Sequence, residues 1–203
     1  MTLVVDSLSV RRGGRVLFDA MTFDVGAGEV VGLVGPNGCG KSTLLQAVAG
    51  VLEPRAGHVM IDGASVWGGR DARKRARRQL GYVPEGADAP GFLTGGELWA
   101  LCAATRGARP AVTPEVESAL ALDELAARTL DTMSLGQRRR ACLGAALVGA
   151  PAVLVLDEPD NGLDVTRMTA LVALLQAYAG AVLIASHDEI WLDRLSARRV
   201  RLQ

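Results

Sequence analysis

The sequence predicts an α/β fold, and three features carry that prediction. An apolar run at 30–34 indicates a buried strand, which leads through a glycine-rich loop into a helical pattern at 42–48. The end of the chain alternates buried-strand and helix patterns, as α/β cores do. Between 84 and 149 the strand signals stop, and helical stretches separated by Gly and Pro take over. We therefore expect one domain of 203 residues, with an α/β core of 1–83 and 150–203 and a helical segment of 84–149 inserted in it.

The individual elements follow from local patterns. Strands are expected at 3–5, 21–25, 30–34, 59–61, 153–156, 181–185 and 200–202. Helices are expected at 42–48, 97–105, 115–120, 137–148 and 165–177. A basic run at 70–78 holds six Arg or Lys residues. We expect it to be the solvent-exposed face of a helix rather than a phosphate-binding patch.

Composition narrows the class of protein. Hydrophobic residues make up 49% of the chain, which indicates a globular protein with a large core. Lys plus Arg and Asp plus Glu balance at 22 each, so no overall field draws nucleic acid or an anionic membrane, and we expect no nucleic-acid partner. No apolar run approaches the roughly 20 residues that span a bilayer, and the first residues lack the basic region of a signal peptide. Three cysteines without metal-ligand spacing indicate free thiols in a reducing cytoplasm.

The strand at 30–34 leads into the most informative motif of the chain, a loop with the pattern Gly, four residues, Gly-Lys-Ser. Its residues are Gly35, Pro36, Asn37, Gly38, Cys39, Gly40, Lys41, Ser42 and Thr43. Glycines let the backbone aim several N–H groups at one anion, Lys41 adds a charge for the β- and γ-phosphates, and Ser42 offers its hydroxyl to Mg²⁺. An ordinary strand-to-helix turn would not need Lys41 and Ser42 here, so we expect a nucleoside triphosphate. The same amides and charge should make Cys39 the most reactive of the three thiols.

Two acids follow the strand at 153–156, at the edge where α/β sheets bind ligands. Asp157 is expected to hold Mg²⁺ through water opposite Ser42, and Glu158 to orient and deprotonate the attacking water. The alternative is a strand-end turn with two solvated acids. His187 follows the last core strand, where a histidine is more often structural. Because the chain also carries the phosphate loop and Glu158, we expect His187 to be a hydrogen-bond donor that senses the γ-phosphate.

Ser134 precedes the helical pattern at 137–148 and is a candidate N-cap. The first N–H groups of the helix that it opens can bind an anion. The residues alone leave two explanations equally open: a capped helix and nothing more, or one part of a phosphate site.

These pieces, in this order, resemble the ATP-binding subunit of ABC transporters over nearly the whole chain. The matching motifs are the phosphate loop 35–43, Tyr82-Val83-Pro84-Glu85, the signature Met133-Ser134-Leu135-Gly136-Gln137, the strand and acids at 153–158, the loop Asn161-Gly162-Leu163-Asp164, and His187. The resemblance implies a P-loop NTPase core of ABC-ATPase type, with an antiparallel β region near the N-terminus and an inserted helical subdomain. It also implies an ATPase that uses ATP and Mg²⁺ as a head-to-tail dimer, in which Ser134 and Gly136 of one subunit close over the ATP of the other.

The resemblance assigns roles to four further residues. Gln137 belongs to the nucleotide-binding signature, and Asp164 to the D-loop beside the reacting groups. Glu85 stands where the family has Gln, near Mg²⁺ and the attacking water. Arg12 replaces the aromatic residue that stacks on adenine, and because a guanidinium stacks on any base, we expect a weaker preference for adenine.

The signature and the two loops are similar to the branch that drives drug and bacteriocin-resistance exporters, and the region 17–20 is similar to haem-exporter ATPases. The implied partners are integral membrane permease subunits and a second copy of the chain or a homologous ATPase subunit. This places the protein in the cytoplasm, on the inner face of the cell membrane through the permease. Two alternatives stay open: an ABC-type ATPase that regulates a peripheral complex, and a subunit that hydrolyses ATP poorly because of Glu85 and Arg12.

Other classes of nucleotide-binding protein lack support. A small GTPase would carry an Asn/Thr-Lys-x-Asp motif after the phosphate loop, and the chain has none. A chromosome-maintenance ATPase needs a long coiled coil before Asp157, where this chain has no sustained heptads.

Overall fold

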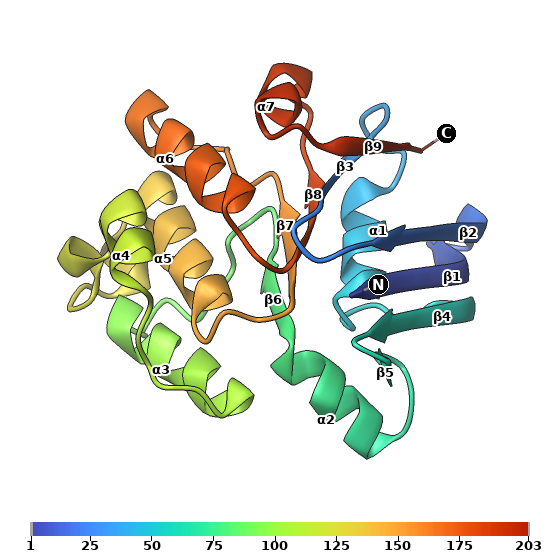
Figure 1. Ribbon diagram of the computed structural model, residues 1–203, viewed down its shortest axis with the longest axis horizontal. Coiled ribbons are helices and arrows are strands. Elements are labelled where there is room, and N and C mark those ends of the chain that lie inside the picture. The colour runs from blue at the N-terminus through green and yellow to red at the C-terminus, as the bar shows by residue number, and fades with distance from the viewer. Residues whose placement is uncertain (1, 203) are drawn as a thin grey trace.

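The structure of the protein is a computed structural model that describes residues 2–202 (Figure 1). Its strands are β1 (Leu3–Arg12), β2 (Arg15–Val25), β3 (Val30–Val34), β4 (Ala56–Ile61), β5 (Ala64–Ser65), β6 (Leu80–Val83), β7 (Val153–Asp157), β8 (Ala181–Ala185) and β9 (Arg198–Arg201). Its helices are α1 (Lys41–Val48), α2 (Arg70–Arg78), α3 (Gly95–Arg106), α4 (Pro114–Leu120), α5 (Leu135–Leu147), α6 (Val165–Gln176) and α7 (Glu189–Arg194), with short 3₁₀ turns at Asp123–Leu125 and Leu130–Thr132. The predicted α/β class is confirmed.

The strands form two sheets. One is antiparallel, with the order β2-β1-β4-β5, and it lies near the N-terminus as the resemblance implies. The other is parallel throughout, with the order β6-β7-β8-β3-β9. Its register pairs Val83 with Leu156, and Asp157 with Ala185. Because these strands run in one direction and end at similar levels, the residues that follow them emerge at one edge of the sheet.

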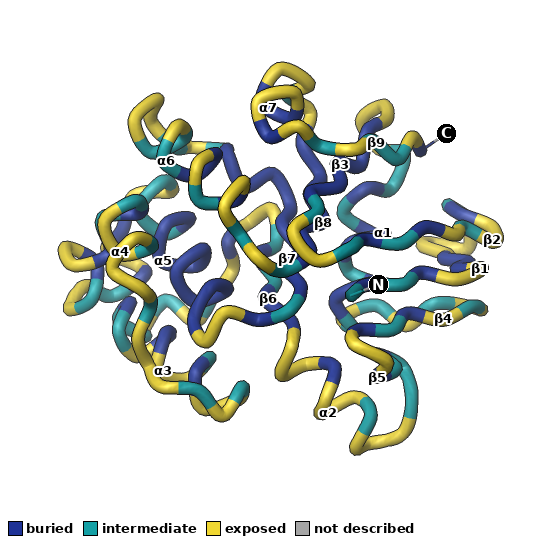
Figure 2. The backbone as a smooth tube through the Cα atoms, viewed as in Figure 1, coloured by how far each residue is buried: buried dark blue, intermediate teal, exposed yellow. Residues whose placement is uncertain are grey.

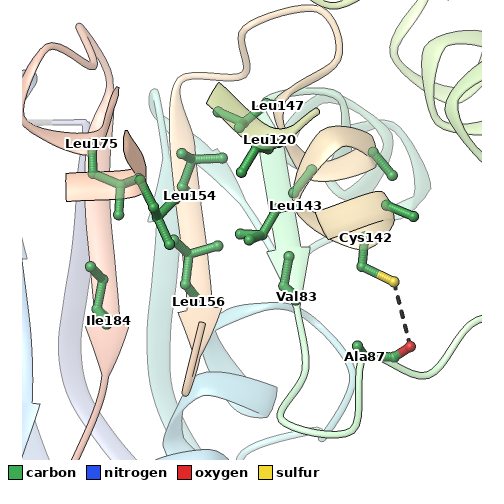
Figure 3. Packing of buried hydrophobic residues seen from close by; sticks show 14 of the residues in the cluster. Val83, Ala87, Leu120, Cys142, Leu143, Leu147, Leu154, Leu156, Leu175 and Ile184 are labelled. Atoms are coloured by element: carbon green, nitrogen blue, oxygen red, sulfur yellow. Dashed lines mark hydrogen bonds between the residues drawn. The ribbon is translucent and has the colours of Figure 1, made fainter. Parts of the chain in front are cut away.

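The central strands of the parallel sheet are buried on both faces (Figure 2). Successive side chains of β7 therefore alternate between two hydrophobic cores. Val153 and Val155 face the core formed with α1 and the antiparallel sheet. Leu154 and Leu156 face the core formed with α5 and α6, where Leu143 of α5 points toward the sheet (Figure 3). The sheet is thus held between two packed layers.

α3, α4 and α5 lie between β6 and β7 in the chain and form one side of the molecule (Figure 1). Two of these helices begin with a capping box, Thr94 with Glu97 in α3 and Ser134 with Gln137 in α5. In each, the two residues satisfy backbone donors that the first helical turn leaves free. The indole Nε1 of Trp99 then joins α3 to α5, donating to the Ala141 carbonyl at 2.9 Å.

Arg106, at the end of α3, ties these helices to the parallel sheet. Its Nη1 donates to the carbonyls of Ala145 at 2.8 Å and Val148 at 2.6 Å, and its Nη2 donates to the Leu80 carbonyl of β6 at 3.0 Å. The first two acceptors lie at the end of α5, where helix carbonyls lack intrahelical partners. One guanidinium therefore both caps α5 and fixes it to β6.

The sequence patterns missed β6 and α7, as well as the two-residue strand β5 and both 3₁₀ turns. β6 has four residues, and the second is Gly81, which is a weak strand signal. The structure shows why glycine is there: a Cβ would collide with the Ala146 carbonyl of α5. α7 is short, and it is defined by the Asp188 cap and by the fully buried Trp191. Within residues 2–202, every helix falls short of the length and apolar character that a bilayer crossing requires.

Candidate active site

The edge of the parallel sheet brings together the residues that the motifs singled out. β3 runs into the phosphate loop, β6 into Pro84 and Glu85, β7 into Glu158, and β8 into Ser186 and His187. They surround a cavity of about 580 Å³. It is lined by Arg12, Leu17, Asn37, Gly38, Gly40, Lys41, Ser42, Thr43, Glu85, Glu158, Asn161 and His187.

The phosphate loop takes its shape from Gly40, the N-cap of α1. Gly40 has a φ of 104°, and a Cβ there would lie 2.8 Å from the Phe18 ring, so no other residue fits. Lys41 begins the helix, and the carbonyls of Gly35 and Pro36 hold its Nζ at 2.9 and 3.4 Å. Gly40 offers no side chain to cap α1, so the first N–H groups of the helix are available to an anion.

Asp157 is buried with one oxygen unsatisfied. It is 2% exposed, and its Oδ1 has no hydrogen-bond partner among residues 2–202. Burial raises the pKa of the Asp157 carboxyl to about 6; Ser42 and Arg139 oppose the rise, while Glu85 and Glu158 add to it. A divalent cation at Oδ1 would compensate this buried charge.

The donor set around Asp157 fits Mg²⁺. Across residues 2–202, no three His, Cys, Asp or Glu side chains are grouped so that they could hold a metal by themselves. Mg²⁺ commonly takes one or two carboxylates and completes its shell with substrate phosphates and water. Asp157, with the Ser42 hydroxyl, supplies such a partial set.

Glu158 and His187 form a pair at the cavity. The Nδ1 of His187 lies 2.7 Å from the Glu158 Oε2, and the backbone N–H of His187 donates to the same oxygen at 3.3 Å. The hydrogen bond, and then the carboxylate charge, raise the pKa of His187. Glu158 has a φ of 47°, which is uncommon for a residue other than glycine. His187 thus holds Oε2 and leaves Oε1 available to a water molecule.

Motif reasoning missed Arg139. This residue of α5 is 1% exposed and donates to the carbonyls of Pro84, Glu85 and Asp157. It therefore joins α5 to the ends of β6 and β7 beside the cavity. The signal was its place beside the apolar remainder of the helix, from Ala141 to Leu147, because a guanidinium buried there requires several acceptors.

Comparisons with known proteins agree with this geometry. The sequence matches the family described as ABC transporter over residues 18–161. The chain belongs to the ABC transporter family. It is 37% identical to the cytochrome c biogenesis ATP-binding export protein CcmA of Novosphingobium aromaticivorans, over 98% of this chain and 95% of that protein. It is 33% identical to the ferric enterobactin transport ATP-binding protein FepC of Escherichia coli, over 84% of this chain and 65% of that protein.

A solved structure described as the ATP-binding subunit of an ABC transporter superposes with a TM-score of 0.90, at 28% identity, and the match covers 100% of this chain and 86% of that one. The protein is an ATP-binding ABC ATPase, as the motifs predicted.

Arg12 and Glu85 both line the cavity of this ABC ATPase. The Arg12 Nη1 donates to the Thr43 Oγ1 at 3.2 Å, so the guanidinium lies against the phosphate loop; its stacking on a base stays a prediction. Leu17 and Asn161 also line the cavity, and sequence reasoning named neither as a site residue. Asn161 could have been found from its place three residues after Glu158.

Cys39 belongs to the phosphate loop, and its expected reactivity stays a prediction. Its side chain does not line the cavity. A Cβ built on Gly35 would lie 2.9 Å from its Sγ, and the thiol packs against the core beneath the antiparallel sheet. Its N–H donates to the Pro36 carbonyl at 3.2 Å. The loop therefore turns this thiol inward. Gly35, Pro36 and Cys39 shape the loop without lining the cavity, and the carbonyls of the first two hold Lys41.

Ser134, Gly136, Gln137 and Asp164 lie outside the cavity. Ser134 is the N-cap of α5, as predicted, and exchanges hydrogen bonds with Gln137 at 3.3 and 3.0 Å. Gly136 lies so close to the Gly162 carbonyl that a Cβ would collide with it. Asp164 is the N-cap of α6 and accepts a backbone N–H of that helix. The signature of the ABC ATPase therefore packs against the D-loop, and not against its own phosphate loop.

Proposed function

We propose that this ABC ATPase powers solute export through separate membrane subunits, with ATP closing two copies head to tail and hydrolysis opening them. The observation that carries the proposal is a site divided into two parts. Lys41 and Glu158 line the cavity, whereas Ser134 and Gly136 lie outside it. A second copy, placed head to tail, brings the N-terminus of its own α5 to the phosphates, where free N–H groups bind anions.

The residues at the cavity have distinct roles in the proposed reaction. Lys41 and the first N–H groups of α1 bind the β- and γ-phosphates. Glu158 accepts a proton from the attacking water through Oε1, the water oxygen bonds to the γ-phosphorus, and the bond to the ADP oxygen breaks. His187 holds Glu158 through Oε2 and donates to the γ-phosphate, which its raised pKa favours.

Ser42 and Asp157 are the residues that would hold Mg²⁺, with Glu85 as a further acid beside them. The cation, when bound, neutralises charge on the phosphates. The unsatisfied Oδ1 of Asp157 supports this assignment.

The proposed partners are integral membrane permease subunits, which would hold the ATPase on the inner face of the cell membrane. The match to the export protein CcmA spans 95% of that protein, whereas the matches to the Fe(3+) import protein FbpC of Rhodococcus jostii and the molybdenum import protein ModC of Rhodobacter capsulatus span 59% and 54% of theirs, which favours export. Purification of the tagged protein from detergent-solubilised membranes should recover a polytopic membrane protein. Recovery of a peripheral complex without one would indicate a regulatory ATPase instead.

Glu158→Gln tests the catalytic part of the proposal, because it removes the base and keeps the shape of the side chain. Hydrolysis should fall by about 10² to 10⁴. ATP should then hold the variant as a dimer, seen by light scattering as a doubled mass.

A second change locates the other half of the site. Adding Ser134→Arg to the Glu158→Gln variant should abolish the dimer and leave ATP affinity of the monomer intact, because Ser134 lies outside the cavity. Glu53→Gln removes the same charge from an exposed residue, and should affect neither turnover nor mass. If Ser134→Arg weakens ATP binding by the monomer as much as Lys41→Ala does, the site is not shared between subunits.

A further inference from the structure

α2 concentrates positive charge that ATP hydrolysis does not use. Six of its nine residues are Arg or Lys and one is Asp, so the helix has a net charge of +5 in a chain whose total is zero. The rest of the chain is accordingly net −5. All six basic residues are exposed, and within residues 2–202 none of them forms an ion pair.

Four of these cations form a row on one face of α2. Arg70, Arg73, Lys74 and Arg77 recur at the helical spacing i, i+3, i+4 and i+7, which places them on the same side. Together with Thr105 of α3 they line a groove of about 570 Å³. Like charges at this spacing repel one another, so the row is unfavourable without an anionic partner.

The row lies where a flat surface can reach it. α2 projects from the body beside α3, and most of its surface is exposed (Figures 1 and 2). Ala76, its one buried residue, lies outside this row and anchors the helix to the core. On α3, Leu101 lies one turn before Thr105 on the same helix face and is 54% exposed, so an apolar side chain flanks the cations.

We infer that the exposed face of α2, with Leu101 beside it, docks on an anionic phospholipid surface. A row of four cations about 10 Å long on a projecting helix meets a plane of phosphates while the net-negative remainder of the chain stays clear. Guanidinium groups bind phosphate in a bidentate manner, and basic helices are attracted to anionic leaflets. An extended nucleic acid would have to cross the net-negative surface, and the groove offers an acidic peptide no sheet edge to pair with. The inference rests on the proposed work at a membrane and adds a lipid contact to the permease contact.

Vesicle sedimentation of the purified protein tests this assignment. The protein should bind vesicles of phosphatidylcholine and phosphatidylglycerol mixed three to one, and bind pure phosphatidylcholine far more weakly. Replacing Arg70, Lys74 and Arg77 together by Gln should lower partitioning by roughly 100-fold, since each basic residue near an anionic surface contributes about fivefold. Gln keeps the helix propensity of Arg and Lys, so the variant should stay folded and its ATPase activity should stay unchanged.

The matched control replaces Arg55, Arg109 and Arg201 by Gln. These residues are exposed and form no side-chain hydrogen bond within residues 2–202. Their replacement lowers the net charge of the protein by the same amount as the change in α2, but at positions far apart in the chain. This variant should retain vesicle binding.

Three results would overturn the inference: equal binding to both kinds of vesicle, equal loss in the control, or tighter binding of a short DNA duplex or polyglutamate through the same residues of α2. Because no permease is present, failure here leaves the transport proposal standing. Failure to recover a permease would, in turn, leave a measured vesicle affinity intact.

Discussion

Two stretches of this chain are rich in arginine, and the fold uses them in opposite ways. α2 carries its basic side chains on the surface, where none forms an ion pair within residues 2–202. α5 carries Arg138, Arg139 and Arg140 in its first half, and the last two are 1% and 9% exposed. Arg139 donates to carbonyls at the ends of β6 and β7, and Arg140 donates to the Leu120 carbonyl at 3.0 Å, at the end of α4.

The difference shows that available acceptors, and not the number of charges, decide where a guanidinium lies. α5 packs where strands and helices end, and such ends leave carbonyls without backbone partners. One planar guanidinium can satisfy several of them. α2 buries Ala76 alone against the core, so its charged side chains meet water.

The largest effect is expected at Arg139. Arg139→Met keeps the apolar stem and removes three hydrogen bonds to carbonyls, of which only that of Pro84 keeps another donor within residues 2–202, the Ala87 N–H, so the free energy of unfolding should fall by about 4 kcal/mol. ATPase activity should fall with it, because Pro84, Glu85 and Asp157 lose their common anchor. Arg77→Met is the matched change in α2 and should cost less than about 0.5 kcal/mol. Urea unfolding measures both, and equal small losses would remove the distinction between the two segments.

Asp157 sharpens the comparison, because it is a buried acid beside Arg139. Its carboxyl loses the proton near pH 6 in the folded protein and near 3.8 in the unfolded chain. The folded state binds more protons between these values, so stability should fall as the pH rises through them, by up to about 3 kcal/mol. In EDTA and without nucleotide, Asp157→Asn should therefore be more stable than the parent at about pH 8, and the gain should shrink toward pH 5. A gain that is the same at both pH values would contradict the assigned pKa.

Arg140 allows the contribution of a hydrogen bond to a carbonyl to be compared with that of an ion pair, because its side chain makes both. Its Nη2 donates to the Glu124 Oε1 at 2.7 Å, but the Glu124 side chain is 53% exposed. Exposed ion pairs contribute little, so Glu124→Gln should cost less than about 0.5 kcal/mol. Arg140→Met should cost about 1.5 kcal/mol, because the Leu120 carbonyl loses its donor. Equal costs in urea unfolding would show that the ion pair dominates.

The smallest effect is expected in α2 and has the opposite sign. Replacing Arg70, Lys74 and Arg77 by Gln removes like-charge repulsion at helical spacing, which should raise the free energy of unfolding by about 0.5 kcal/mol at low salt. At 1 M salt, where the screening length is about 3 Å, the gain should disappear. A loss of stability at low salt would mean that these side chains support the fold.

The sequence by itself determined the features that depend on neighbours along the chain. The predicted limits of β3 and β8 are those observed, because a short, fully apolar run bounded by loops has few other solutions. The positions of Lys41, Asp157, Glu158 and His187 followed from the strands that precede them. The N-cap role of Ser134 followed in the same way, since a cap needs only the next turn of its own helix.

Only the tertiary structure decided which segments meet. β6 is too short and too poor in strand formers to be recognised alone, and it exists because β7 pairs with it and α5 packs on Gly81. The inward turn of Cys39 depends on the core beneath the loop, and the burial of Arg139 depends on carbonyls supplied by two distant strands. Arginines look alike in a sequence, since neither their composition nor their spacing records the acceptors that folding places beside them.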